Sequence, residues 1–403
     1  MRAINAQSRI SMSAFLFAVY CALAPANMVM NFTGSTINRY VGLLVAAALG
    51  IRLLKTKEMT VNMKIVLPLF LYLIWTLITC FWTIDIYAST SSTITHLSLV
   101  GIFLFGTLVG FNASEIRFIK AMVVLLAAAL TFYIVPAVGS DTPTRATLQT
   151  AAGIADQNGL AANMVFALWV AIDQAREARR FWTKILYGAA IILISYSMLV
   201  IASRGALVGF LMAALLYFVI FRAYRIRPAV LILVVIAGVL VYQYALQKNP
   251  VAMRRLSISE TISDGGTGRS VTWPAIWELL LEHPVRLIIG YGYGCEGAVG
   301  LLARHVWIGT HNVYLELLAT TGVVGVVLFL VFIGSIALDA VKRKDYLGVA
   351  VVIVFMAVCF VLGFSKDKGA WNMLLLTTVG FDHNQYTSAN MQSRKRGIIE
   401  KDF

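Results

Sequence analysis

Residues 309–339 read GTHNVYLELLATTGVVGVVLFLVFIGSIALD. From Val313 onward this stretch carries only two charged side chains, Glu316 and Asp339. About 20 consecutive apolar residues are enough for an α-helix to cross the hydrocarbon layer of a membrane, so residues 313–339 are predicted to span it. His311, Asn312 and Glu316 stand at the beginning of this helix, where packing alone gives no reason for polar side chains.

The composition of the whole chain agrees with a membrane protein. Of its 403 residues, 60% are hydrophobic and 13% are charged, whereas about a quarter of the residues in a soluble domain are charged. The net charge of +14 is compatible with nucleic-acid binding, but the distribution of these charges along the chain favours membrane orientation instead. Nucleic acid is therefore not expected as a partner, and membrane lipids are. The four cysteines indicate no disulfide framework.

Apolar stretches divide the chain into a series of predicted membrane helices. These are residues 11–31, 40–54, 64–82, 97–111, 118–138, 159–174, 184–202, 205–221, 228–246, 313–339, 345–365 and 369–381. Residues 184–221 are too long for one crossing, so the chain is predicted to reverse at Ser203-Arg204-Gly205. The expected fold is an all-α integral membrane protein with about twelve transmembrane helices and one long extracytoplasmic loop that contains short helices.

The basic residues predict the orientation of these helices. Of the 33 Lys and Arg residues, 22 fall on one side of the membrane when alternate loops are grouped; they lie in residues 2–9, 52–64, 117–120, 176–184, 222–227, 342–344 and 394–401. Positive charge stays on the cytoplasmic side in short loops, so both termini are predicted to be cytoplasmic. The chain then divides into helices one to nine (1–246), an extracytoplasmic catalytic loop (247–312), and helices ten to twelve with a basic tail (313–403).

Residues 247–312 form the only long loop of this arrangement, and long loops are usually functional. An amphipathic helix is predicted within it, because Trp273, Ile276, Trp277, Leu280 and Leu281 follow a helical spacing, and Ser270 or Thr272 is its expected N-cap. Glycine-rich residues 290–294 then predict a turn.

The polar residues on the predicted outer face suit chemistry on a phosphate. Arginine binds phosphate through two charge-assisted hydrogen bonds, and Arg204 and Arg269 lie on this face. A histidine such as His311 accepts a proton near neutral pH. Motifs for nucleoside triphosphates, zinc hydrolysis and nucleophilic serine are absent from the sequence. A reaction without metal or cofactor, on a phosphate-bearing substrate at the membrane surface, is therefore expected.

Each of these residues also has a purely structural interpretation. Arg204 could reach lipid headgroups, as arginines beside membrane helices do, and Arg269 could be a solvated loop charge. Asn312 is a natural N-cap, His311 could be an interfacial residue, and Glu316 could pair with an arginine. Taken singly, no position decides between the two interpretations.

Taken together, four segments resemble the superfamily of O-antigen ligases and O-antigen polymerases. Ser203-Arg204-Gly205 is similar to its S-R-G turn, and Thr267-Gly268-Arg269 with Trp273 and Gly290-Tyr291-Gly292 is similar to its T-G-R loop. His311-Asn312, followed after nine residues by Gly322 and then by Gly325, resembles its histidine motif. Asp156-Gln157-Asn158 resembles a D-P-N element with Gln157 in place of proline.

The resemblance implies a glycosyltransferase that takes a glycan from a polyprenyl (undecaprenyl) diphosphate donor in the bacterial inner membrane. It implies that Arg204 and Arg269 hold the diphosphate and that His311 is the catalytic base. We expect the substrate to be bound by Arg204, Arg269, Asn312, Glu316, Asn158, Trp273 and Tyr291.

The acceptor stays open: lipid A-core for a ligase, or another lipid-linked glycan for a polymerase of O-antigen, capsule or exopolysaccharide. A flippase or transporter of lipid-linked sugars is a further alternative, but it predicts polar residues within the membrane helices, which the sequence largely lacks.

Overall fold

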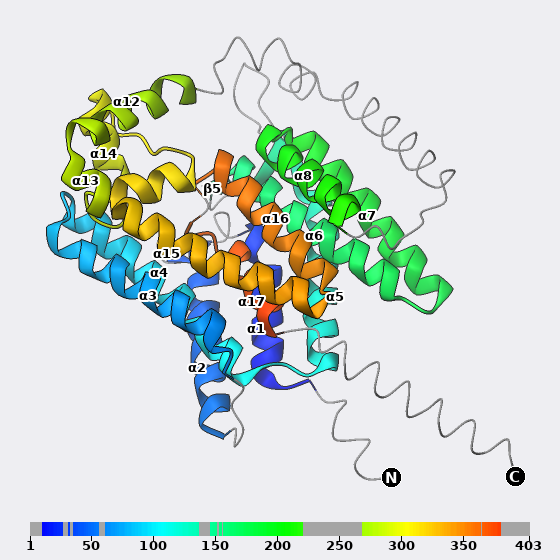
Figure 1. Ribbon diagram of the computed structural model, residues 1–403. Coiled ribbons are helices and arrows are strands. Elements are labelled where there is room, and N and C mark those ends of the chain that lie inside the picture. Colours follow the sequence, from blue (N-terminus) through cyan, green and yellow to red (C-terminus); the bar gives the residue numbers. More distant parts are fainter. Residues whose placement is uncertain are drawn as a thin grey trace, which may run out of the picture.

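A computed structural model describes residues 10–26, 31–32, 35–55, 61–136, 146–150, 153–154, 156–220, 268–363 and 365–379 of the chain. Most of these residues are helical (Figure 1). The α-helices are α1 (Met12–Ala22), α2 (Ile37–Lys55), α3 (Met63–Thr79), α4 (Ile86–Val109), α5 (Ala113–Leu130), α6 (Gln157–Glu177), α7 (Phe181–Ile201), α8 (Arg204–Ile220), α12 (Arg269–Glu282), α13 (Pro284–Ile289), α14 (Glu296–Arg304), α15 (Val313–Arg343), α16 (Tyr346–Val361) and α17 (Lys368–Val379).

The described residues also contain short elements that the sequence did not predict. Three 3-10 turns extend helix ends: η2 (Ala24–Ala26), η3 (Cys80–Trp82) and η4 (Thr131–Tyr133). Two small antiparallel sheets are present, one of β1 (Asn31–Phe32) and β2 (Ser35–Thr36), the other of β3 (Ile134–Pro136), β4 (Ala146–Thr150) and β5 (Gly153–Ile154). The helix predicted for 118–138 therefore ends early, at Leu130, and Ile134–Pro136 form the strand β3, which pairs with β4.

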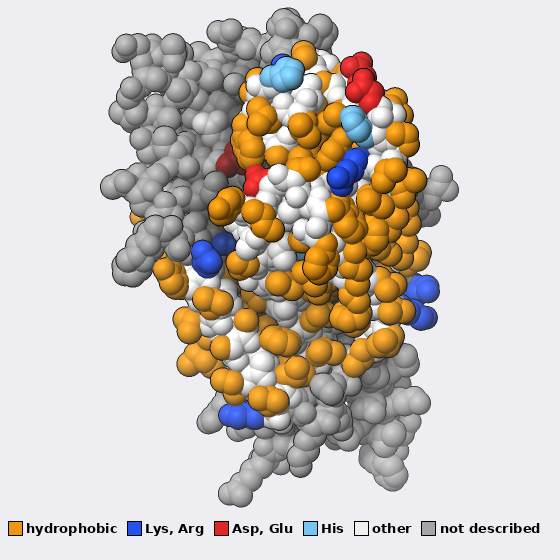
Figure 2. Space-filling model, turned by 90° about the vertical axis from the view of Figure 1, so that its left-hand side faces the viewer, with side chains coloured by type: hydrophobic (Ala, Val, Ile, Leu, Met, Phe, Trp, Pro, Cys, Tyr) orange, Lys and Arg blue, Asp and Glu red, His pale blue; other side chains and the backbone are white. Residues whose placement is uncertain are grey.

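The protein is a multi-pass membrane protein, although the predicted number of crossings is confirmed only in part. Six helices within the described ranges are long and apolar enough to cross a membrane, and α1 and α16 are shorter apolar helices. The predicted span 228–246 lies outside the described residues, and each of the other predicted spans overlaps one helix. Figure 2 shows a broad hydrophobic surface on one face, with most of its histidine and acidic side chains towards the top.

Helix α6 forms the centre of the bundle. Every side chain from Leu160 to Ala171 is buried, as expected for a helix that is hydrophobic on all sides. Helix α15 runs beside α3 and α16 (Figure 1). The rings of Phe103, Phe332 and Trp371 meet at centroid distances between 5.5 and 5.9 Å and connect α4, α15 and α17.

A kink in α15 receives the turn between α13 and α14. Gly322 has a φ of 71° inside the helix, and a Cβ at this position would lie 2.0 Å from the carbonyl oxygen of Ile288. The amide groups of Tyr291 and Gly292 donate hydrogen bonds to the carbonyl oxygens of Ala319 and Thr320 at 2.9 and 2.8 Å. Glycine at 322 thus lets two backbones touch, which fixes α13 and its turn against the beginning of α15.

Two predicted local features can be compared with the structure. The reversal at Ser203-Arg204-Gly205 is confirmed, because α7 ends at Ile201 and α8 begins at Arg204. The N-cap predicted for the loop helix is wrong: α12 begins at Arg269 after Gly268, which has a left-handed φ of 80°. The hydroxyl of Thr272 instead donates to the carbonyl of Gly268 at 3.1 Å.

The buried face of α12 also differs from the predicted one. Thr272, Ile276 and Leu280 are buried at a spacing of four residues, whereas Trp277 and Leu281 are 47% and 54% exposed. The spacing of apolar residues predicted the helix correctly. Which side of α12 is buried depends on how α13, α14 and α15 pack around it.

Charged side chains form ion pairs at the far end of α15 from His311, one of them between α5 and α6. The Lys120 ammonium lies 2.7 Å from one carboxylate oxygen of Asp173, and Arg176 lies 2.9 Å from the other. At the same end of α15, Arg343 pairs with Asp339 at 2.8 Å. We call these three pairs the distal ion pairs.

Candidate functional site

His311 is the centre of the candidate site. Its side chain is exposed just before α15 begins. Partial burial of the ring lowers the pKa of His311 below its ordinary value; the positive charge of Arg269 lowers it further, and the negative charge of Asp156 opposes the change. The structure therefore brings together residues from three distant motifs, and it keeps the imidazole neutral, and able to accept a proton, over a wider pH range.

The backbone of His311 is held on both sides. His311 has a φ of 49°, in the left-handed region that non-glycine residues rarely adopt. The Thr310 hydroxyl donates to the carbonyl of Asn312 at 2.9 Å and accepts from its amide at 3.2 Å. The indole of Trp273 donates to the carbonyl of Thr310 at 2.9 Å. These bonds stabilise an otherwise unfavourable backbone conformation at His311.

Asn312 is the N-cap of α15, as the sequence predicted. Its side-chain oxygen accepts a hydrogen bond from the amide of Leu315 at 3.1 Å. Its side chain is buried, so the contact that the structure gives it fixes the helix start beside His311.

The S-R-G turn and the T-G-R loop both contact the end of α16. Arg269 donates from Nη2 to the carbonyl of Val361, the last residue of α16, at 2.9 Å. Gly205 packs on the side chain of the same valine, where an added Cβ would come within 2.5 Å. Since Arg204 directly precedes Gly205, Val361 links the S-R-G turn to the T-G-R loop.

A further contact joins the same turn to the beginning of α6. The Ser203 hydroxyl donates to the side-chain oxygen of Asn158 at 3.1 Å. Asp156 caps α6 by accepting from the amides of Asn158 and Gly159 at 3.3 and 2.8 Å. The segment Asp156-Gln157-Asn158 is thereby placed next to the S-R-G turn.

Two predicted site residues have different surroundings. The Tyr291 ring is buried against Arg286, whose guanidinium carbon lies 5.3 Å from the ring centroid, and against His283. Glu316 is buried one turn after Asn312 and accepts a hydrogen bond from the Ser365 hydroxyl at 2.8 Å. The hydrogen bond that the structure gives Glu316 thus comes from a serine, and not from an arginine as one interpretation of the sequence expected.

Sequence reasoning missed a second polar cluster, formed by the connection between α16 and α17. Lys366 donates to Glu296 of α14 and to Ser92 of α4, both at 3.0 Å. Although burial opposes its charge, the carboxylates of Glu316 and Glu296 raise the pKa of Lys366. The only signal in the sequence was the charged run Lys366-Asp367-Lys368 between two apolar stretches, which looks like an ordinary loop.

The same connection reaches α6. Asp367 accepts from the Asn163 amide at 3.3 Å and from the amide of Ala370 at 2.8 Å, and burial raises its pKa to about 6. The connection between α16 and α17 is therefore fixed to helices α4, α6 and α14 at once.

The arrangement offers a proton acceptor, His311, and the guanidinium of Arg269, whose charge acts on it and which suits an anion. Among the residues that the structure describes, no group of three or more His, Cys, Asp or Glu side chains could hold a metal ion.

Comparison with protein families identifies the segment that contains these residues. Residues 189–330 match the model of the O-antigen ligase family. This match includes Arg204, Arg269, His311 and Glu316, while Asp156 and Lys366 lie outside it. No curated protein matches the chain. Members of the family are O-antigen ligases and polymerases, which are enzymes of the glycosyltransferase type. The chain therefore carries an O-antigen ligase domain over residues 189–330 of a multi-pass membrane protein.

Proposed function

We propose that this protein transfers a glycan from a polyprenyl diphosphate, such as undecaprenyl diphosphate, to a hydroxyl group of an acceptor glycan. The observation that carries the proposal is the meeting of three motifs, far apart in sequence, around His311 and the end of α16. The charge of Arg269 acts on His311, and Val361 joins Arg269 to the S-R-G turn. The family match covers all three motifs.

In the proposed reaction, the acceptor oxygen attacks the anomeric carbon of the donor sugar. The bond between this carbon and the diphosphate oxygen breaks, and polyprenyl diphosphate leaves. Neutral His311 takes the proton of the acceptor hydroxyl as the new bond forms. General-base catalysis requires a group that is unprotonated at the working pH, which the lowered pKa of His311 supports.

Arg204 and Arg269 are proposed to stabilise the leaving diphosphate. Negative charge grows on this group in the transition state, so fixed cationic donors accelerate the reaction. Arg269 also occupies the first turn of α12, where the helix dipole favours an anion. Its bond to the Val361 carbonyl holds the guanidinium in place without neutralising it.

The other predicted substrate contacts receive revised roles in this proposal. Trp273 and Asn312 are positioning residues, because their hydrogen bonds fix the backbone around His311. Asn158 positions the S-R-G turn through Ser203. Glu316 and Lys366 stabilise the connection between α16 and α17 through Ser365 and Glu296, and Tyr291 anchors the turn against α15.

We also propose the cellular arrangement. The protein lies in the bacterial inner membrane with about twelve helices, both termini in the cytoplasm, and residues 247–312 on the outer side. The distribution of Lys and Arg supports this orientation. Residues 1–246 and 313–403 then form the membrane part around the catalytic loop.

The acceptor is proposed to be lipid A-core, in agreement with the ligase description of the matching family. Deleting the gene and separating surface glycans on a gel tests this. If the deleted protein is a ligase, the polymer remains on the polyprenyl carrier and none is found on lipid A-core. If it is a polymerase, single repeat units replace the ladder of polymer lengths. An unchanged surface glycan in the deletion strain contradicts both activities.

A further inference from the structure

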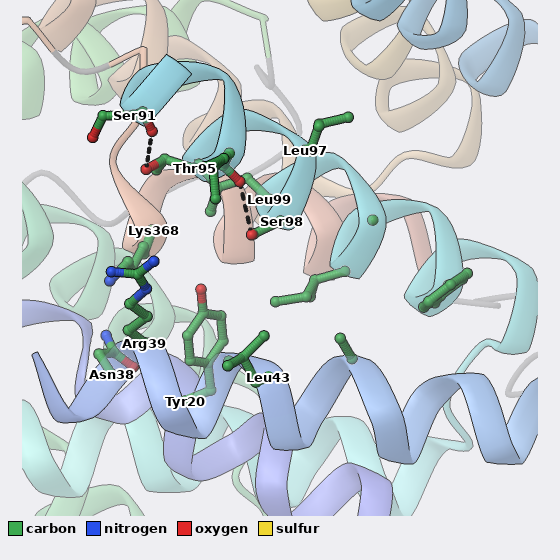
Figure 3. A pocket seen from close by; sticks show the side chains of 16 residues that line it. Tyr20, Asn38, Arg39, Leu43, Ser91, Thr95, Leu97, Ser98, Leu99 and Lys368 are labelled. Atoms are coloured by element: carbon green, nitrogen blue, oxygen red, sulfur yellow. Dashed lines mark hydrogen bonds between the residues drawn. The ribbon is translucent and has the colours of Figure 1, made fainter. Parts of the chain in front are cut away.

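A cavity of about 430 Å³ lies between α2 and α4, apart from the residues of the proposed transfer site. Figure 3 shows side chains of both helices facing each other across it. Its walls include Leu43, Ala46, Ile94, Ile102 and Phe105. Leu43 and Ile94 are also strongly exposed on the surface of the protein, so the cavity continues into the apolar face that contacts lipid.

The hydroxyl groups along the α4 wall do not make this wall strongly polar. Thr95 donates to the carbonyl of Ser91 at 3.1 Å, and Ser98 donates to the carbonyl of Ile94 at 2.8 Å. Both hydroxyl protons are thus used within the helix. A hydrocarbon chain can therefore lie against α4 without removing these donors from their partners.

One end of the cavity is cationic. Arg39 at the start of α2 and Lys368 at the start of α17 both line it and lie next to each other in Figure 3. Their charges interact across the gap, and Asp367 offsets part of the positive charge. Two like charges destabilise each other at close range unless an anion lies between them.

A buried amide lies at the same end. Asn38 also lines the cavity, its side chain is only 2% exposed, and neither its amide nitrogen nor its oxygen has a hydrogen-bond partner among the described residues. A buried polar group without a partner costs free energy, so its presence in a cavity wall indicates a ligand that completes its hydrogen bonds.

We propose that this cavity binds one anionic membrane lipid, whose head group carries a phosphate and no compensating positive charge. Its phosphate lies between Arg39 and Lys368 and accepts a hydrogen bond from Asn38, and one hydrocarbon chain lies between α2 and α4. A free phosphate ion would leave the apolar walls unused, and a lipid without net charge would not offset the positive charge that Arg39 and Lys368 share at this end. The proposal of a lipid site does not rest on the proposed transfer reaction, because none of the residues that line the cavity belongs to the transfer site.

Contacts through α6 connect the lipid site with the transfer site. Lys368 directly follows Asp367, which is bonded to Asn163 of α6, and the charge of Asp156, the N-cap of α6, acts on His311. A lipid held here therefore borders the connection between α16 and α17.

Native mass spectrometry of the purified full-length protein in detergent tests the proposal by binding and not by transfer. The probes are phosphatidylglycerol, a polyprenyl monophosphate, phosphatidylcholine and inorganic phosphate, each added separately. We expect the first two to bind. The double variant R39Q/K368Q should weaken their binding roughly tenfold or more, because it removes two charge-assisted contacts. The control variant R180Q/K342Q removes one Arg and one Lys at exposed positions elsewhere and should bind normally.

A second pair of variants tests the hydrocarbon part. A Cβ added at Gly101, which lines the cavity, meets no atom within 4 Å, so Gly101→Leu should fill the cavity and weaken lipid binding without touching the cations. Gly188→Leu on α7 is its control, because a Cβ there also meets nothing within 4 Å. The proposal is overturned if phosphatidylcholine binds as well as phosphatidylglycerol, if inorganic phosphate displaces the lipids, or if R39Q/K368Q and G101L bind like their controls.

Discussion

The two ends of α15 use charged and titratable residues in opposite ways. At the distal end, Lys120 and Asp173 are 1% and 7% exposed, and each has the other as an ionic partner inside the protein. At the near end, His311 is exposed, and the charges of Arg269 and Asp156 change its pKa in opposite senses. The backbone at the near end is strained at His311, whereas the residues of the distal pairs lie in helices or cap them.

This contrast indicates that the distal ion pairs contribute to stability and that His311 contributes to function. A buried ion whose partner is internal costs several kcal/mol when the partner is removed. An exposed histidine with a lowered pKa, held by hydrogen bonds on both sides, has little to contribute to packing and much to contribute to chemistry. Substitutions at the distal end should therefore change stability, and substitutions at the near end should change the transfer rate.

The largest effect is expected at His311. Replacing it with Gln keeps a hydrogen-bonding side chain but removes the proton acceptor, so the transfer rate with purified donor and acceptor should fall roughly 10²–10⁴-fold. Thermal stability should stay close to that of the unmodified protein, because the side chain is exposed. Near-normal turnover by the variant with an unchanged pH profile would rule out the base role.

At the distal end, Lys120→Met should lower the free energy of unfolding by about 3 kcal/mol, because it leaves the buried Asp173 carboxylate with the partly exposed Arg176 as its remaining ion pair. The transfer rate per folded molecule should not change. Arg117→Met is the matched control on the same helix, since Arg117 is exposed and donates a hydrogen bond to the Ser114 hydroxyl at 3.3 Å. Equal thermal denaturation of the two variants would show that the distal pair is not structural.

Next in size are Arg204→Lys and Arg269→Lys. Lysine keeps the charge but loses the planar pair of donors, so loss of transition-state stabilisation of about 2–4 kcal/mol should lower the rate roughly 10²–10³-fold. Arg304→Lys is the control, because Arg304 also bonds a neutral oxygen, the Thr272 hydroxyl at 2.8 Å, outside the proposed site. If all three variants transfer glycan equally well, the diphosphate role is wrong.

The smallest effect concerns the pH profile. Neutral His311 is the active form, so kcat/KM should fall as pH drops through its lowered pKa, below the ordinary histidine value. Asp156→Asn removes the charge that raises this pKa and should move the acid limb to lower pH; Asn still caps α6. Arg269→Gln should move it to higher pH. Shifts in the same direction for both variants would contradict the electrostatic arrangement around His311.

Local signals in the sequence predicted much of this structure correctly. The reversal before Arg204 and the N-cap at Asn312 both follow from short-range chemistry, the length limit on a membrane helix and the capping preference of asparagine. The N-cap of α12 was mistaken because Gly268, in a left-handed conformation, directly precedes the helix, so that Ser270 and Thr272 lie inside it.

The sequence by itself determined that the chain is helical, that it belongs in a membrane, and which residues could perform chemistry on a phosphate. These properties follow from the numbers and spacing of apolar, basic and capping residues. Only the tertiary structure decided which polar residues meet: that Val361 joins the two arginine motifs, that Glu316 binds Ser365, and that Arg39 and Lys368 share one cavity. Such contacts depend on how helices pack side by side, and no local pattern along the chain encodes the distance between residues on different helices.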